Sequence, residues 1–258
     1  MKKIGVIGCG WLGLPLAKHL ATKYSRVKGT SRSTIKLEEM QHAGVDAFLI
    51  DIEPTIIKGN FKAFIRDLDT LVIGVNASKS EDYFKKIDLL SRYVAESEVK
   101  NIVFLSTTSV YEDLNKVVEE QDATDASSLY LRVENVFRNN PRFKTTVLRL
   151  GGLIGKDRHP IKSLTGKQLD QNPKVPVNLV HQGDCISVIT TIIDKNIWND
   201  TFNVVYPYHP TKQEYYTQKA RELSLAPPLY DESVDFKGKV VSSSKLMERL
   251  KFNFSHEI

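Results

Sequence analysis

The chain has 258 residues, 41% of them hydrophobic and 26% charged, a composition that fits a soluble globular protein and excludes disordered and fibrous chains. Lys and Arg (36) outnumber Asp and Glu (31) to give a net charge of +5, and without long basic blocks this argues against a nucleic-acid partner. A phosphorylated small molecule suits the mild positive charge equally well.

The cysteine content and the N-terminus bear on where the protein resides. Two cysteines, Cys9 and Cys185, are too few for a disulfide framework, which predicts a reducing compartment and therefore the cytoplasm. Two lysines before an apolar run imitate a short signal peptide, but the four glycines and Pro15 within residues 4–17 argue against export. Elsewhere no apolar stretch approaches the ~18 residues of a membrane span, so we expect no membrane partner.

Short β-branched runs alternate with amphipathic segments along the first part of the chain. We expect strands over 3–7, 27–30, 45–50, 70–75, 101–106 and 145–150. We expect helices over 12–23, about 34–42, 81–98 and 129–139. Strands that are apolar throughout and separated by helices predict a parallel sheet covered on both faces, which is a Rossmann-type doubly wound α/β fold.

The alternation breaks after Gly155. Residues 156–177 are rich in Lys, Gln, Asn and Pro, and are followed by predicted strands over 178–181 and 202–205 and predicted helices over 184–196, 211–224 and 244–250. We therefore predict two domains, 1–155 and 156–258. The second is smaller and irregular, with strands and helices that return to the core of the first.

The glycine-rich segment 8–13 (GCGWLG) follows a predicted strand and opens a predicted helix. In this setting a G-x-G-x-x-G pattern favours a dinucleotide: the glycines allow a tight turn, close approach of a pyrophosphate and close helix packing. The predicted cofactor-binding residues of this loop are Gly8, Gly10, Trp11, Leu12 and Gly13. The alternative is a glycine-rich turn that holds no ligand.

The end of the second strand bears on which dinucleotide binds. A carboxylate about 20 residues past the glycines would bond the ribose 2′-hydroxyl of NAD, but the segment 27–33 has no Asp or Glu. It has Arg32 instead, flanked by Ser31 and Ser33, with Lys36 one helical turn further on. A guanidinium suits a phosphate, so the sequence predicts NADP, with NAD the less favoured cofactor. The alternative is a solvated loop arginine.

Several segments together resemble an extended short-chain dehydrogenase/reductase. They are the glycine motif, Asp51 after the third strand, 104–111 (FLSTTSVY) and 148–155 (LRLGGLIG). More narrowly, they resemble the NAD-dependent epimerase/dehydratase group. The segments 11–13 (WLG), 158–160 (RHP) and 178–181 (NLVH) resemble its atypical YeeZ-like bacterial branch. The resemblance implies that 1–155 binds NAD(P) and that 156–258 binds substrate.

The resemblance also implies a catalytic set of a Ser or Thr, a Tyr, and a Lys four residues after the Tyr. Thr107 matches the first position and Tyr130 the second, but the third is Glu134. Acid/base work by a tyrosine needs a nearby positive charge, because a free phenol ionises near pH 10, and a carboxylate one turn away opposes it. Either a cation comes from another segment, or Tyr130 is a surface tyrosine. Thr107 could likewise be a simple loop hydroxyl.

The resemblance assigns further contacts. Asp51 would reach the adenine, while Val75 and Gly151 would approach the cofactor from neighbouring strand ends. The candidate substrate contacts are Ser109, Arg158, His159 and His181, each with a structural role as its alternative. Asp184 is interpreted as a helix N-cap only. The histidine and cysteine spacing predicts no metal, and without a G-x-S-x-G turn a Ser-His-Asp hydrolase is not supported.

These observations lead to one functional prediction and two alternatives. The prediction is an NADP-linked oxidoreductase, epimerase or dehydratase that acts on a small molecule, with a nucleotide sugar or a carbonyl compound as its substrate class. The first alternative is a dinucleotide-binding sensor that has lost the chemistry, which the missing lysine favours. The second is a structural protein whose glycine loop is empty. By resemblance, the protein pairs as a homodimer.

Overall fold

The computed structural model describes residues 2–76, 80–123, 125 and 127–258. The chain forms two compact units. Unit 1 comprises Met1–Val110, Asp125–Arg149 and Ile186–Phe202, and unit 2 comprises Tyr111–Thr124, Leu150–Cys185 and Asn203–Ile258. The predicted boundary after residue 155 stays a prediction.

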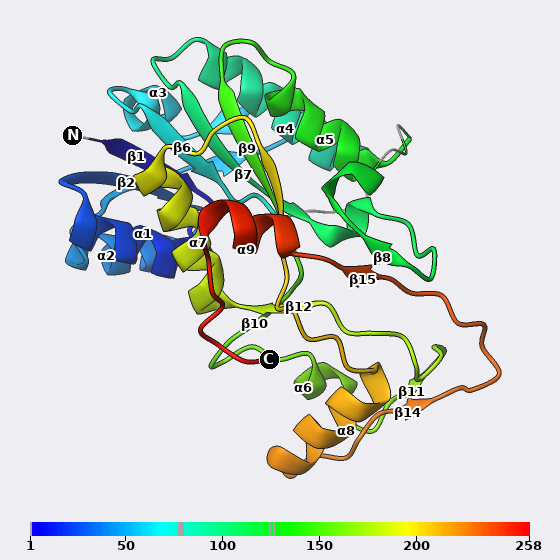
Figure 1. The fold of residues 1–258 in the computed structure, drawn as a ribbon. Helices are drawn as coiled ribbons and strands as arrows, with labels where there is room; N and C mark the ends of the chain where they lie inside the picture. The colour runs from blue at the N-terminus through cyan, green and yellow to red at the C-terminus, as the bar shows by residue number, and fades with distance from the viewer. Residues whose placement is uncertain (1, 77–79, 124, 126) are drawn as a thin grey trace. The chain divides into compact units, whose positions relative to one another are not determined.

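A seven-stranded sheet, drawn in Figure 1, forms the framework of unit 1. Its strands are β1 (Lys3–Ile7), β2 (Arg26–Ser31), β3 (Asp46–Leu49), β6 (Thr70–Ile73), β7 (Asn101–Thr107), β9 (Lys144–Leu150) and β13 (Thr201–Val204), in the order β13-β9-β7-β6-β1-β2-β3. The pairs from β3 to β7 are parallel, and Val6 lies between Gly29 and Val72. Since the strand order reverses between β1 and β6, the carboxyl ends of these two strands flank the topological switch point, where such sheets bind ligands.

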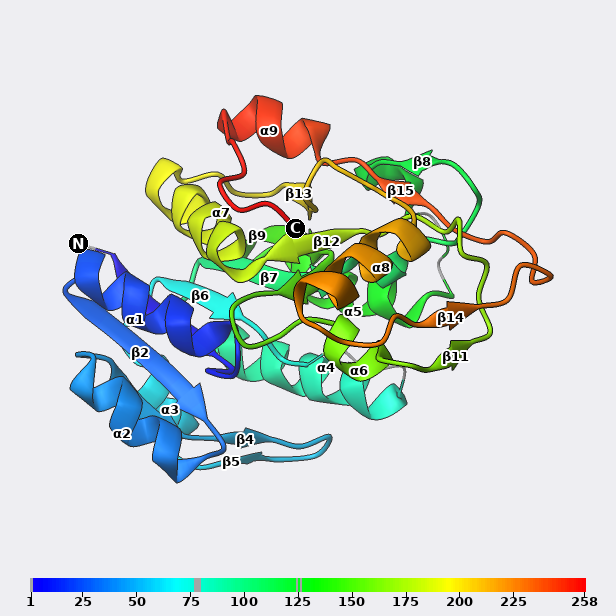
Figure 2. The same cartoon turned by 90° about the horizontal axis from the view of Figure 1, so that it is seen from below.

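Helices cover both faces of this sheet. These helices are α1 (Gly13–Lys23), α2 (Thr34–His42), α3 (Phe61–Ile65), α4 (Glu81–Ala95), α5 (Leu129–Arg138) and α7 (Gln182–Lys195). Figures 1 and 2 show α4 and α5 side by side, with α1 across the sheet from α4. On the α1 face, Lys23 forms an ion pair with Asp194 of α7 at 2.8 Å.

The apolar core of unit 1 explains why these segments take these forms. Five consecutive residues of β7, 102–106, are buried, as expected of a strand covered on both faces. On α4 the buried positions Tyr83, Ile87, Leu90 and Val94 recur at helical spacing and form one apolar stripe. This stripe joins residues of α3, α5, β6 and β9 in a single core cluster.

Unit 2 consists of short elements. They are β8 (Val117–Val118), β10 (Gly152–Ile154), α6 (Ile161–Leu164), β11 (Gln168–Leu169), β12 (Leu179–His181), α8 (Lys212–Glu222), β14 (Leu229–Tyr230), β15 (Val240–Val241) and α9 (Ser244–Leu250). Three parallel two-stranded pairings organise them: β10 with β12, β11 with β14, and β8 with β15. A second apolar cluster unites α6, α8 and β12.

The predicted doubly wound fold is confirmed. The strand predicted over 202–205 is β13, and it extends the main sheet beside β9, a partner that local sequence does not specify. The structure also contains elements that sequence did not predict, among them α3, the antiparallel ribbon of β4 (Asp51–Ile52) and β5 (Ile57–Lys58), and two 3₁₀ turns, Thr108–Val110 and Glu120–Asp122. Within the described ranges, no helix is long and apolar enough to cross a bilayer.

Candidate functional site

The glycine loop between β1 and α1 is shaped by close backbone contacts. Gly8 has a φ of +89°, and a Cβ there would stand 2.4 Å from the carbonyl oxygen of Gly74. A Cβ on Gly13 would stand 2.2 Å from the carbonyl oxygen of Gly8. Gly10 differs, because its Cβ would meet nothing closer than the Gly8 oxygen at 3.9 Å. The fold therefore requires Gly8 and Gly13 for its own packing, whereas the space beside Gly10 suits an approaching phosphate.

The N-terminus of α1 is electrostatically prepared for an anion. Its N-cap residue, Leu12, makes no side-chain cap bond, and the first turn contains no acidic residue. Leu14 and Leu16 of the first turn already donate to the carbonyls of Gly10 and Leu12, and Pro15 has no amide hydrogen, so the attraction for an anion comes mainly from the positive end of the helix dipole. The negative charge of a dinucleotide pyrophosphate suits this end of the helix, so the loop fits this group.

Backbone bonds and one buried thiol hold the loop in place. The amide of Cys9 donates to the Thr30 carbonyl at 2.8 Å, and the Gly8 amide donates to the Thr30 hydroxyl at 3.1 Å. The Cys9 thiol packs against Gly29 and Met40, and burial raises its pKa to about 12. Cys9 is therefore a packing residue of the loop, while Trp11 at the start of the helix is half-buried.

The end of β2 carries the predicted cofactor-selecting residues. The Ser31 hydroxyl is buried and accepts from the Ser33 amide at 3.1 Å. Arg32 is 71% exposed, and its Nε lies 3.9 Å from Oδ1 of Asp51. The positive charge of Lys36 acts on the Cys9 thiol against the larger effect of burial, because it favours the thiolate and so lowers the pKa. Arg32 and Asp51 thus lie close to each other, and their predicted contacts with the cofactor stay predictions.

The strand ends next to β1 carry the other predicted residues of unit 1. Val75 follows β6 and is partly buried against the core. Thr107 ends β7, and its Oγ1 lies 3.2 Å from the Ser109 hydroxyl and accepts from the Ser109 amide. Tyr130 is partly buried on α5.

Glu134 occupies the position where the resemblance expects a lysine. It is fully buried, and both oxygens of its carboxylate accept hydrogen bonds. Its carboxylate accepts from Arg149 Nε at 3.0 Å and from a terminal nitrogen of the same guanidinium at 2.7 Å. The Ser106 hydroxyl donates to it at 2.6 Å. Sequence reasoning missed this set, because Arg149 comes from β9 and the pairing is tertiary. Arg149 offsets the charge of Glu134, while a cation that acts on Tyr130 itself stays a prediction.

The remaining predicted residues lie in unit 2. Gly151 is buried, and a Cβ there would stand 2.8 Å from the Asn178 carbonyl oxygen, so close backbone packing already requires glycine. Arg158 is exposed in a turn in which its amide and carbonyl bond those of Gly155. The prediction that Gly151 and Arg158 contact cofactor and substrate stays a prediction.

Both ring nitrogens of His159 are engaged within unit 2. Nδ1 accepts from the Ile161 amide at 3.2 Å, so Nε2 carries the proton and donates to the Tyr215 hydroxyl at 2.8 Å. Burial lowers the pKa of His159, and the nearby Lys219 lowers it further. These contacts favour the structural role that the sequence left open beside substrate binding.

His181 belongs to a cluster around the buried carboxylate of Asp184. Its ring stacks on His256, with centroids 4.2 Å apart, and burial together with His256 lowers the pKa of His181. The prediction that Asp184 is the helix N-cap is wrong, because α7 begins at Gln182 and Asp184 is its third residue. Its carboxylate accepts from the amides of Ser255 and His256, from the Ser255 hydroxyl and from His256 Nδ1. One buried carboxylate thus anchors the segment near the end of the chain to the start of α7.

We expect Asp184→Ala to release this segment, because four hydrogen bonds end on the lost carboxylate. The expected loss of stability is about 2 kcal/mol, since the bonds to a charged acceptor are partly replaced by water. Chemical denaturation measures the loss, and hydrogen exchange at the Ser255 and His256 amides should become faster. Glu257→Ala is the control, because Glu257 is exposed. Unchanged exchange in Asp184→Ala would show that the segment is held by other contacts.

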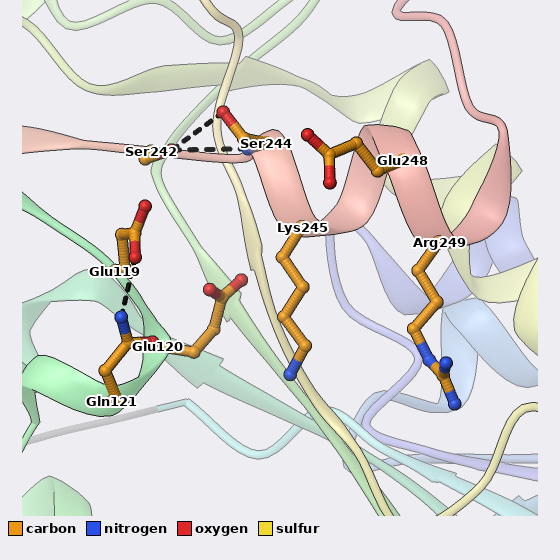
Figure 3. Close-up of a pocket in the computed structure, with 8 residues that line it drawn as sticks. All are labelled: Glu119, Glu120, Gln121, Ser242, Ser244, Lys245, Glu248 and Arg249. Atoms are coloured by element: carbon orange, nitrogen blue, oxygen red, sulfur yellow. Dashed lines mark hydrogen bonds between the residues drawn. The ribbon is translucent and has the colours of Figure 1, made fainter.

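A polar pocket of about 610 Å³ lies elsewhere in unit 2 (Figure 3). Glu119, Glu120 and Gln121 form one wall, and Ser242, Ser244, Lys245, Glu248 and Arg249 form the other. None of the predicted site residues lines it. Across the described part of the chain, no group of three or more His, Cys, Asp or Glu side chains is placed to hold a metal ion.

The chain is similar in sequence to a known bacterial protein. Protein YeeZ of Escherichia coli (strain K12) is 32% identical to it over 266 aligned residues, which cover 99% of this chain and 97% of that protein. The chain belongs to the YeeZ family. Residues 3–133 of this YeeZ family protein also match the family described as the NAD binding domain of 6-phosphogluconate dehydrogenase, so the glycine loop lies in an NAD-binding domain.

Solved structures show the same fold. UDP-glucuronic acid 4-epimerase from Bacillus cereus in complex with NAD aligns with a TM-score of 0.79 at 17% identity, over 99% of this chain and 94% of that one. The DesIV double mutant, a dTDP-glucose 4,6-dehydratase from Streptomyces venezuelae with NAD and DAU bound, aligns with a TM-score of 0.81 at 15% identity, over 99% and 93%. The predicted resemblance of this YeeZ family protein to the epimerase/dehydratase group is thereby confirmed at the level of fold.

Proposed function

We propose that this protein is an NAD(P)-dependent oxidoreductase, epimerase or dehydratase that acts on a small molecule, with nucleotide sugars as the leading substrate class. The observation that carries the proposal is the loop at the switch point: a helix N-terminus without a side-chain cap or an acidic residue, behind a glycine whose missing side chain leaves open space. Two structural neighbours, an epimerase in complex with NAD and a dehydratase with NAD bound, support the reaction class.

We propose NADP as the preferred cofactor. Arg32 is an exposed guanidinium at the end of β2, and its only described ionic partner, Asp51, is at the outer limit of an ion pair. A 2′-phosphate offers a bidentate partner of greater charge. Lys36 lies one turn further along α2 and adds a second positive charge.

The chain's own residues would have the following roles. The N-terminus of α1 would hold the pyrophosphate, and Arg32 with Ser31 would hold the 2′-phosphate. The Thr107 hydroxyl, already engaged with Ser109, would orient the substrate oxygen, and Tyr130 would exchange a proton with it. Nicotinamide, when bound, would supply the hydride-transfer chemistry. Gly151, Arg158 and His181 remain proposed contacts of cofactor and substrate, whereas the contacts of His159 favour its structural role. Homodimerisation remains a proposal.

Calorimetric titration of the apo-protein with NADPH and, separately, NADH tests the proposal. We expect micromolar binding of NADPH, stronger than that of NADH. Equal affinities would refute the preference for NADP and keep the dinucleotide site. Absence of binding to either, in a protein whose circular dichroism shows an intact fold, would refute the proposed function.

We expect Arg32→Asp to weaken NADPH binding by about 1–3 kcal/mol, the range for a hydrogen bond to a charged group, while NADH binding changes less. The reason is that the variant removes a cation facing the 2′-phosphate and introduces a carboxylate in its place. The same calorimetry measures both affinities. Arg66→Asp is the matched control, since Arg66 is a similarly exposed arginine of unit 1, at 75%. Equal losses for the two cofactors would contradict the 2′-phosphate assignment.

A second candidate function is a dinucleotide-binding sensor without chemistry. The observation that favours it is Glu134, which occupies the lysine position of the family's catalytic set and is engaged in the protein interior. Adding UDP-glucose or dTDP-glucose to protein loaded with the oxidised cofactor separates the two functions. Absorbance of a reduced nicotinamide, or conversion of the sugar, supports the enzyme. Tight cofactor binding without either, across a panel of nucleotide sugars and carbonyl compounds, supports the sensor.

A further inference from the structure

The buried set of Ser106, Glu134 and Arg149 is unusual for the core of unit 1. The Arg149 and Glu134 side chains are 1% and 0% exposed, and they share a two-pronged contact in which Nε and a terminal nitrogen both reach the carboxylate. Burying two charges is costly, and well-packed apolar residues of similar volume often stabilise a fold equally well. Stability alone therefore does not account for an ion pair here.

The three residues come from the three elements that carry or adjoin the proposed reacting groups. Ser106 is the residue directly before Thr107 in β7. Glu134 lies one turn after Tyr130 on α5, so the two side chains share a helix face. Arg149 is on β9, two residues before Gly151. The planar guanidinium fork fixes both distance and orientation, which a single apolar contact would not do.

The Tyr130 side chain is held by apolar packing. It is partly buried against the core cluster that contains Tyr83 of α4 and Val133 and Phe137 of α5. Because Tyr130 and Glu134 are four residues apart on α5, they lie on the same face of that helix. The position of the Tyr130 ring therefore depends on how α5 is held against the sheet.

We propose that Glu134, held by Ser106 and Arg149, is a positioning residue that fixes Tyr130 on α5 relative to Thr107 at the end of β7. The inference rests on the proposed function, in which these two hydroxyls share a substrate oxygen. The negative charge one turn from Tyr130 is offset by Arg149 of β9, so Glu134 can lie beside Tyr130 as part of a neutral pair. Ser106, directly before Thr107 in β7, and Glu134, one turn after Tyr130 on α5, thus link the positions of the two hydroxyls.

The test follows the environment of Tyr130 directly. The protein is labelled with 3-fluorotyrosine, and the resonance of Tyr130, one of ten tyrosines, is assigned by its loss in Tyr130→Phe. Ser106→Ala removes one bond of the set and keeps the ion pair. Glu134→Asp keeps the charge but shortens the reach by one methylene, so the carboxylate cannot meet both partners.

Thr145→Val is the matched control. The Thr145 hydroxyl is buried and donates to the Phe137 carbonyl at 3.0 Å, so this variant also removes one hydroxyl bond between the sheet and α5, but far from Tyr130. We expect the fluorine resonance of Tyr130 to shift or broaden in Ser106→Ala and Glu134→Asp and to stay in place in Thr145→Val. If Glu134→Asp does not fold, Ser106→Ala alone decides.

An unchanged Tyr130 resonance in Ser106→Ala, or an equal change in Thr145→Val, would overturn the positioning role. The measurement uses the full-length apo-protein and needs neither cofactor nor turnover. Failure of the proposed function, seen as absent NADPH binding in the calorimetric titration, is therefore distinguishable from failure of this inference. Where a nucleotide sugar is turned over, Ser106→Ala should lower kcat and leave KM unchanged.

Discussion

Gly10→Ala is expected to fold normally and to lose NADPH affinity by a factor of ten or more, about 1.4 kcal/mol. A Cβ at this position has no protein atom nearer than 3.9 Å, so the substitution leaves the loop's own packing unchanged. It fills the space through which the pyrophosphate reaches the first amides of α1. Calorimetry measures the affinity, and thermal unfolding shows that stability is retained.

Gly13→Ala is the contrasting variant. Its Cβ would stand 2.2 Å from the Gly8 oxygen, a backbone atom that cannot move aside, so we expect a loss of stability of about 1–3 kcal/mol from overpacking. The two variants separate a glycine kept for the ligand from a glycine kept for the fold. Retained affinity in Gly10→Ala would mean that the dinucleotide does not approach this loop.

The second large effect is expected at the buried ion pair. Arg149→Met leaves the Glu134 carboxylate without its counter-charge in the interior, which typically costs about 3–5 kcal/mol. Glu134→Gln/Arg149→Met removes both charges while an amide oxygen remains for the Ser106 hydroxyl, so most of the stability should return. Urea unfolding followed by tryptophan fluorescence measures both, because Trp11 and Trp198 lie in unit 1. A double variant as unstable as Arg149→Met would contradict charge burial as the cause.

The longer strands and helices of unit 1 could be predicted because their burial follows from local pattern. The central residues of β1 and β7 are apolar, and the stripe of α4 has helical spacing. The pairings in unit 2 could not be predicted, since a strand of two residues has no periodicity. The partner of β8 lies more than a hundred residues away in β15.

In the candidate site, too, the local features could be predicted and the contacts between distant segments could not. The glycine loop was predictable because the turn, the helix start and the close approach are encoded in six consecutive residues. Glu134 was expected to oppose Tyr130, and only the tertiary contact with Arg149 of β9 shows its charge to be offset. Asp184 has an ordinary helix-cap pattern, while its partners Ser255 and His256 arrive from a distant segment. Sequence spacing carries no information about contacts between such distant segments.

The buried thiol in the glycine loop has a practical consequence. Cys9 and Cys185 are the chain's two cysteines, both are buried, and burial raises the pKa of each well above that of a free thiol. The native protein should therefore be inert to thiol-specific labels. A dye placed on one engineered surface cysteine would then be the sole label on the molecule. Any slow modification of Cys9 would report how often the loop opens, and its suppression by NADPH would measure occupancy of the site without an enzymatic assay.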